Sequence, residues 1–222
     1  MRNFFVLLFI FCLGFKSQGQ NEFFVPVQGE GLSFNTSSLM IVGANASYLP
    51  SWQANSQEVQ LLREHRIGLS HFGIAYGVGY SGHFYHGNVH VNVDPDGTQT
   101  LSFLNSQDYT SNRFATEYLD GVLEFRFRTN SNNKGRYTRF YIGGIIGYLT
   151  DSYSYFNSDA YRVKFYNVGG FNTLRYGTYV KCGRGPFNLF YYFGLNPIVS
   201  SGVLTSELEN ASSQNFGFSI TL

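Results

Sequence analysis

Residues 171–200 read FNTLRYGTYVKCGRGPFNLFYYFGLNPIVS, and they carry the clearest structural signal in the chain. Two runs of alternating residues flank Arg184-Gly185-Pro186, a pattern that predicts a β-hairpin. One face of this hairpin is wide, apolar and aromatic, and the other mixes charge, amide and glycine. A soluble sheet hides its apolar face in a core, whereas a lipid-facing band displays one. The pattern therefore favours strands of a membrane β-barrel.

The two faces of the hairpin are distinct in both runs. The first run places Leu174, Tyr176, Thr178, Val180 and Cys182 on the apolar face, opposite Arg175, Gly177, Tyr179 and Lys181. The second run places Phe187, Leu189, Tyr191, Phe193 and Leu195 there, opposite Asn188, Phe190, Tyr192, Gly194 and Asn196.

The composition agrees with an all-β protein. The chain has 222 residues, of which 18% are aromatic and 13% charged, and its length suits one domain. The formal charge of +1, without a cluster of Lys and Arg, excludes a nucleic-acid partner. Cys12 lies in the expected leader and leaves Cys182 alone, which excludes a disulfide framework. Cys182 is interpreted as a small lipid-facing hydrophobe.

The N-terminus predicts a cleaved signal peptide over residues 1–19. Arg2 precedes an apolar run over 4–15, and Ser17-Gln18-Gly19 supplies small residues at the cleavage positions. The alternative is a membrane anchor helix, but the run is shorter than the roughly 20 apolar residues that a span requires. Because no later run is longer, a chain embedded in a membrane must cross it as a closed barrel.

Eight strands are predicted after a polar lead-in over 20–32. They cover 33–48, 52–62, 67–93, 114–128, 137–155, the two runs of the hairpin and 215–222. The connections after the second, fourth and sixth strands are compact, the first of these being a charged turn at 63–66. Those after the third, fifth and seventh are long loops, at 94–111, 156–170 and 201–214. The first connection, at 49–51, is short and breaks the alternation. Short turns on one side and long loops on the other are typical of outer-membrane barrels. The predicted fold is an eight-stranded antiparallel up-and-down transmembrane β-barrel over 33–222.

An eight-stranded barrel encloses only enough space for side chains. In 114–128 the apolar residues are expected outside and the charged ones inside. Buried charges must be paired, so the interior is predicted to hold a network of ion pairs. A narrow polar conduit is the alternative. The predicted network consists of Asp120, Glu124, Arg126, Arg175 and Lys181.

Three segments resemble the small outer-membrane β-barrel proteins of the PorT type: YLDGVLEFRFR (118–128), RFYIGGIIGYL (139–149) and LRYGTYVKCGRGPFNLFYYFGLNPI (174–198). The resemblance implies a leader, about eight strands and a final strand that ends the chain. It also implies that the last strand is similar to the signal read by barrel-assembly machinery, although it ends in Leu where Phe is commonest. The signal residues are Phe216, Phe218, Ile220 and Leu222. The family's namesake takes part in a protein-secretion system.

The remaining motifs lack the context that a catalytic or metal site needs. Gly77-x-Gly79-x-x-Gly82 matches a dinucleotide fingerprint but lies within a strand. In H-x-x-H-x-x-x-H, His86 and His90 lie about 13 Å apart along one face of a strand and His83 points the other way. No metal or other cofactor is predicted. Serine and histidine do not come within reach as a catalytic dyad, so an enzyme is not expected.

The expected protein is a non-enzymatic outer-membrane barrel of a Gram-negative bacterium. Its predicted partners are the membrane lipid, the assembly machinery during insertion, and a protein bound through the long loops or through lateral contact. Its role would be structural, adhesive or accessory to secretion. The alternative is a soluble periplasmic or secreted lipocalin-like barrel that binds an apolar ligand inside. The two differ in where the apolar side chains point.

Overall fold

The computed structural model describes residues 24–26, 31–44, 49, 51–68, 70–93, 99–105, 108–130, 137–200, 208 and 210–222. The predicted leader lies outside these residues. The strands are β1 (Phe24–Pro26), β2 (Leu32–Val42), β3 (Asn55–Ile67), β4 (Phe72–His86), β5 (Val89–Val93), β6 (Gln99–Phe103), β7 (Ser111–Arg128), β8 (Thr138–Asn157), β9 (Arg162–Tyr166), β10 (Leu174–Arg184), β11 (Phe187–Gly194) and β12 (Ser212–Thr221).

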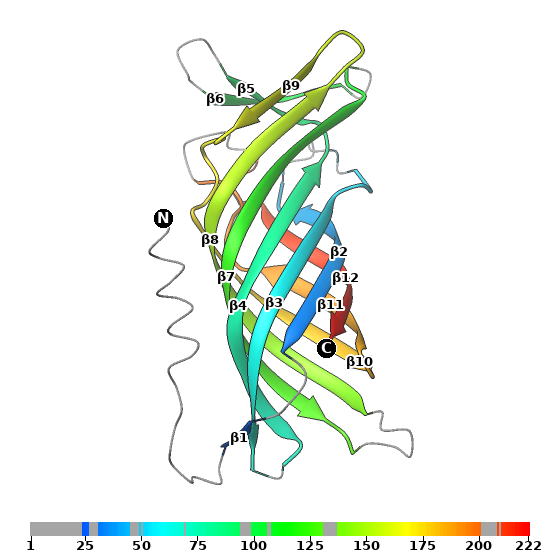
Figure 1. Cartoon of the computed structure of the whole chain (residues 1–222). Coiled ribbons are helices and arrows are strands. Elements are labelled where there is room, and N and C mark those ends of the chain that lie inside the picture. Colours follow the sequence, from blue (N-terminus) through cyan, green and yellow to red (C-terminus); the bar gives the residue numbers. More distant parts are fainter. Residues whose placement is uncertain are drawn as a thin grey trace.

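Eight of these strands form a closed antiparallel ring (Figure 1). The order is β2-β3-β4-β7-β8-β10-β11-β12, and β12 pairs with β2 to close the ring. Outside the ring, β1 pairs with β3, β9 extends the sheet beyond β8, and β5 and β6 form a separate hairpin. The predicted all-β fold with eight antiparallel strands is confirmed.

The connections divide between the two ends of the ring. The short-turn end carries the connections at 68–71, 129–137 and 185–186, and the loop end carries those at 43–54, 87–110, 158–173 and 195–211. The predicted short turn at 49–51 is wrong, because β2 ends at Val42 and β3 begins only at Asn55. With this correction the first connection is also long, and the alternation of short turns and long loops is complete.

The predicted charged turn at 63–66 is also wrong, because β3 continues through it to Ile67. Glu64 points into the ring, is 4% exposed, and forms ion pairs with Arg126 and Arg128. Its charge therefore has partners inside the ring, which a turn in solvent would not supply. The connection begins instead at Gly68, whose φ of 55° suits glycine.

The loop end contains more strand than predicted. The third ring strand does not run on to residue 93: β4 ends at His86 and the separate hairpin β5–β6 follows. This hairpin occupies part of the predicted loop at 94–111, and β9 lies within the predicted loop at 156–170. The physical reason is burial, because Val89 and Val91 pack into an apolar cluster at the loop end and gain from leaving water.

The polarity of the ring is opposite to that of a water-soluble protein. Side chains alternate along each strand, and the apolar ones face outward: Leu189 is 50% exposed and Phe218 is 63% exposed. The charged ones face inward: Arg175 is 6% exposed and Glu124 is 0% exposed. The predicted facing of both hairpin strands and of β7 is confirmed. In β8, the odd-numbered residues from Arg139 to Gly147 face inward.

Glycine allows neighbouring strands to approach closely on the inner face. A Cβ atom on Gly77 would lie 1.9 Å from the carbonyl oxygen of Leu61, whereas one on the outward Gly121 would find its nearest atom at 3.7 Å. We expect Gly77→Ala to lower the free energy of unfolding by about 1–3 kcal/mol, as overpacking does. Gly121→Ala is the matched control and should change it by about 0.5 kcal/mol or less. Denaturant midpoints of the two refolded variants test this, and equal midpoints would contradict it.

Candidate functional site

A group of charged side chains lies inside the ring, and these side chains belong to β3, β7 and β10. Glu124 accepts from Arg126 at 2.6 Å and from Lys181 at 2.9 Å. Glu64 forms ion pairs with Arg126 and Arg128. These side chains form the lower network, in which two carboxylates are shared among three cations.

A second group, the upper network, surrounds Arg175. Its guanidinium donates to both oxygens of Asp120, at 3.0 and 3.2 Å, and lies 3.8 Å from Glu58. It also contacts His83. The Tyr118 and Tyr192 rings each lie 5.2 Å from the guanidinium carbon, so aromatic faces complete its surroundings.

Neutral polar groups connect the two networks to the wall of the ring. Lys181 donates to Ser33 and to Gln60, both at 3.1 Å. Asn35 donates to Glu58 at 3.0 Å and Tyr179 donates to Glu124 at 2.7 Å. Each of these hydrogen bonds links different strands, and shared partners of both signs are what buried charges require. The arrangement can hold the ring in one register.

The structure places all five sequence-predicted residues of the interior network inside the ring, but in two groups. Asp120 pairs with Arg175, and Glu124 pairs with both Arg126 and Lys181. Sequence reasoning missed Glu58, Gln60, Glu64, Tyr179 and His83 as members. The signal for three of them was present, since Glu58, Gln60, Leu62 and Glu64 alternate with outward residues. It was missed because the alternation of the predicted strand 52–62 is weak and because Glu64 was assigned to the turn at 63–66.

An apolar cluster lies at the loop end of the ring, and we call it the loop-end cap. It combines ring residues such as Leu39, Tyr85 and Phe114 with loop residues such as Val89 and Phe171. The further buried members are Ala54, Val91, Val168, Ile198, Val199, Leu208 and Ala211. Since every one of the four long connections contributes, the cap covers the polar interior on this side.

Between the cap and Arg175 lies a cavity of about 10 Å³, lined by Tyr85, Tyr118, Tyr192 and Ser213 among others. That space suits about one water molecule. In the described part of the chain, the interior is thus filled with paired charges and with a second apolar cluster that includes Leu62, Ile145 and Phe190, and it is closed by the loop-end cap. This arrangement suits a rigid plug better than a conduit.

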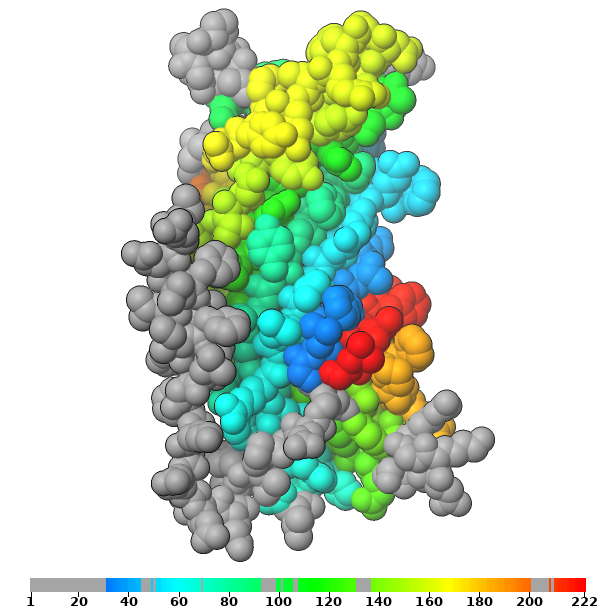
Figure 2. All heavy atoms as spheres, viewed as in Figure 1, coloured from blue at the N-terminus to red at the C-terminus, as the bar shows by residue number. Residues whose placement is uncertain are grey.

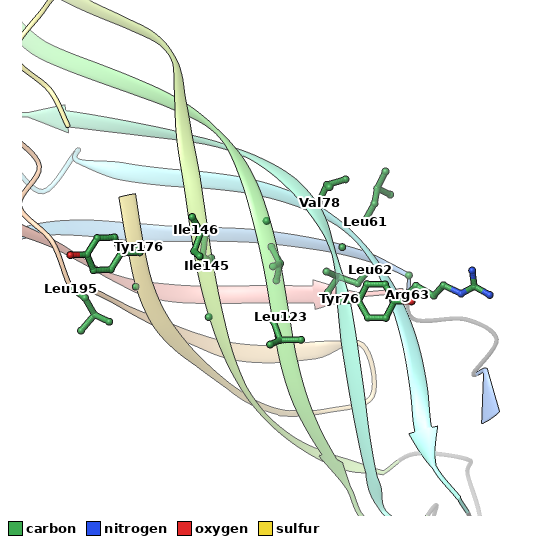
Figure 3. Close-up of a pocket in the computed structure, with 16 residues that line it drawn as sticks. Leu61, Leu62, Arg63, Tyr76, Val78, Leu123, Ile145, Ile146, Tyr176 and Leu195 are labelled. Atoms are coloured by element: carbon green, nitrogen blue, oxygen red, sulfur yellow. The ribbon is translucent and has the colours of Figure 1, made fainter. Parts of the chain in front are cut away.

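The outer wall carries a broad apolar surface (Figure 3). Its side chains include Leu61, Tyr76, Leu123, Ile146, Tyr176 and Leu195, around the outward glycines Gly121 and Gly144. Aromatic residues border it. Phe72, Phe127 and Phe140 are paired neighbours near the short-turn end. Tyr80 and Tyr148 flank Leu119 toward the loop end.

The residues predicted as an assembly signal also face outward. Phe216, Phe218, Ile220 and Leu222 are 51%, 63%, 38% and 58% exposed. They belong to the last ring strand and its end, and this strand closes the ring against β2.

The three histidines do not converge. His83 is inside the ring beside Arg175, and His86 faces outward opposite Arg113. His90 packs on Phe156 in the loop-end region, with ring centroids 4.6 Å apart, and burial lowers the pKa of its imidazole. Among the described residues no three His, Cys, Asp or Glu side chains are grouped to hold a metal ion.

None of the described residues belongs to a helix long and apolar enough to cross a bilayer. Comparisons with protein-family models, with curated proteins and with solved structures found no match.

Proposed function

We propose that this chain is a transmembrane β-barrel of a Gram-negative outer membrane, with a non-enzymatic role. The observation that carries the proposal is the reversed polarity of the ring. Ion pairs such as Arg175–Asp120 lie inside, while large apolar side chains lie outside. In water this arrangement would expose a continuous apolar surface, which soluble monomers rarely do. In hydrocarbon the same arrangement is favourable, because a closed ring leaves no strand edge with unpaired backbone N–H and C=O groups.

The dimensions of the outer surface support the same proposal. On β7 the outward residues from Leu119 to Phe127 are apolar or glycine, and Glu117 is the first charged residue beyond them. This run covers about 26 Å along the strand, or about 20 Å of height at the usual tilt. Outer-membrane barrels carry an apolar band about 25 Å tall between aromatic girdles. The Phe residues near one end and the Tyr residues near the other correspond to such girdles.

Because side chains fill the interior, we place the proposed activity on the outside of the barrel. The ion-pair networks and the loop-end cap serve rigidity, and the long connections or the lateral surface serve contact with a partner. A structural, adhesive or secretion-accessory role fits this division. Assembly through the last strand and membership of the PorT type stay predictions. A soluble lipocalin-like barrel would need an apolar interior with space for a ligand, whereas the described interior holds two ion-pair networks beside an apolar cluster that includes Leu62, Ile145 and Phe190.

A spin label at position 178 tests the proposal directly. Thr178 faces outward in β10 opposite Gly144, within the apolar band. In a Cys182→Ala background the predicted mature chain has no other cysteine. We expect a label on Thr178→Cys, in reconstituted protein, to collide readily with oxygen and rarely with a water-soluble nickel complex. A label on Leu49→Cys at the loop end is the control and should show the reverse.

Free access of the nickel complex to the label at position 178 would exclude a lipid-facing wall. Gel mobility before and after heating, together with cell fractionation, tests the closed barrel and its location. A protein that stays monomeric without detergent would favour the soluble alternative.

A further inference from the structure

Four strands form a continuous outer face above the apolar band: the loop-end halves of β4, β7 and β8, and β9. The strand register aligns His86, Arg113, Tyr155 and Lys164 in one row across them. The row closer to the band includes Tyr153 opposite Tyr166, and the row farther from it includes Asn157 opposite Arg162. We call this surface the basic tyrosine face. It consists of His86, Arg113, Tyr153, Tyr155, Arg162, Lys164 and Tyr166.

The alternation of burial establishes that this face points away from the ring. The residues between its members, Phe114, Phe156 and Phe165, are buried or half-buried, and two of them pack in or against the loop-end cap. Lys164, Arg162 and Tyr166 are exposed. Figure 2 shows the loop-end part of β8, in yellow-green to yellow, and β9, in yellow, on the outer surface near the top of this view.

Two cations of the face, Arg113 and Lys164, are held by tyrosines, and the third, Arg162, donates to Asn157 at 3.2 Å. The Lys164 ammonium lies 4.1 Å from the centre of the Tyr153 ring and 4.3 Å from that of Tyr166. The Arg113 guanidinium lies over Tyr155 at 5.2 Å, and its Nε is buried without a hydrogen-bond partner. In the described part of the chain, no ion pair involves either of these residues or Arg162. Three preorganised positive charges therefore lack an anion.

The position of the face relative to the band indicates which anion it would meet. Arg113 lies six residues beyond Leu119 on the outer side of β7, or about 20 Å along the strand. At the usual tilt this is about 15 Å above the end of the apolar band. The headgroup layer of an ordinary bilayer is only about 5–8 Å thick on each side of the hydrocarbon core, so this level is reached by a headgroup that extends farther from the core, as a sugar headgroup does. The carboxylates of Glu117 and Asp151, which are paired neighbours, lie between the face and the band.

We propose that the basic tyrosine face binds the phosphorylated sugar headgroup of an outer-leaflet glycolipid. Arg and Lys recognise phosphate oxygens with charge-assisted hydrogen bonds. The flat tyrosine rings offer apolar contact area for a sugar ring, and their hydroxyls offer hydrogen bonds. The acyl chains of the same lipid would lie on the apolar band directly below. The proposal rests on the proposed membrane location, since only there does this height coincide with headgroups.

The test compares two triple variants of the full chain in detergent. Arg113→Gln/Arg162→Gln/Lys164→Gln removes the charge of the face and keeps its tyrosines. Arg63→Gln/Arg66→Gln/Arg184→Gln removes three exposed charges away from the face: Arg66 and Arg184 lie near the short-turn end, and Arg63 lies on the outer wall opposite Tyr76. Binding is measured with purified lipopolysaccharide and with the same lipid after phosphatase treatment. Each cation near a lipid phosphate accounts for about a fivefold change in affinity, so we expect about a hundredfold loss in the first variant. The second should bind as the unmodified chain does.

Phosphatase treatment should weaken binding to the unmodified chain as strongly as the first triple variant does. Unchanged affinity after either change would overturn the proposal, and so would equally tight binding to phosphatidylglycerol vesicles, which lack the sugar. Heat modifiability and the label at position 178 are measured in the same variants. If they report a membrane barrel while lipid binding is unaffected, the headgroup site fails and the proposed function stands. If the first triple variant does not fold, Lys164→Gln alone should still lose about fivefold.

Discussion

Replacing Glu124 with glutamine is expected to lower the free energy of unfolding by about 3–5 kcal/mol, the usual cost of breaking a buried ion pair. Glu124 is fully buried and accepts from Arg126, Lys181 and Tyr179. Glutamine keeps the shape of the side chain but removes its charge. Lys181 would then keep only neutral partners, Ser33 and Gln60, inside the ring. The measurement is denaturant unfolding in detergent or lipid, followed by gel mobility.

Two further variants separate charge pairing from simple loss of a carboxylate. Glu117→Gln removes an outward carboxylate from the same strand and should cost about 0.5 kcal/mol or less. Glu124→Gln/Lys181→Met removes both partners of one pair and should regain part of the loss, because an unpaired buried charge is costlier than none. Strictly additive effects of Glu124→Gln and Lys181→Met would show that the two side chains are not coupled, against the proposed rigid plug.

Leu123→Arg should lower the free energy of unfolding in a bilayer by about 2–4 kcal/mol, as Arg does on the lipid face near the midplane of other barrels. Leu123 is midway between Leu119 and Phe127 on the outer side of β7 and is 46% exposed. In a water-soluble protein an exposed substitution of this kind changes stability by about 0.5 kcal/mol or less. The sign and size of the effect therefore report the medium that surrounds the ring. Reversible folding into lipid vesicles, followed by a denaturant titration, measures it.

The matched control is Leu49→Arg, because Leu49 is 56% exposed but belongs to the first long connection. We expect this variant to retain the stability of the unmodified chain. Similar small effects of both substitutions would mean that hydrocarbon does not surround Leu123, and the membrane proposal would have to be withdrawn.

The success of sequence reasoning followed the strength of the local alternation. In β7 from Leu119 to Phe127 and in β10 from Leu174 to Cys182, no charged residue occupies an outward position, and the facing of Glu124, Arg175 and Lys181 was predicted correctly. In β3 the outward positions are Gln57, Val59, Leu61 and Arg63. This series mixes polar, apolar and charged residues, so the alternation between the two faces is weak in the sequence. Its inward Glu58 and Glu64 were missed, because only partners on β7 and β10 make an inward carboxylate favourable.

The strands of the loop end were missed for a related reason. β5, β6 and β9 are short, and each gains stability from packing or pairing with segments distant in the sequence. Val89 and Val91 become buried only because Phe114, Phe171 and Ile198 converge on the same cluster. A short run of residues does not specify such partners.

By itself, the sequence determined an all-β chain of about eight antiparallel strands, and it determined which side chains share a face, because side chains on a strand alternate with a period of two residues. Only the tertiary structure decided which charges meet, that all four long connections close one end, and that the basic tyrosine face is continuous across four strands. These properties depend on register between strands far apart in the chain, and register is set by the packing and hydrogen bonding of the whole ring.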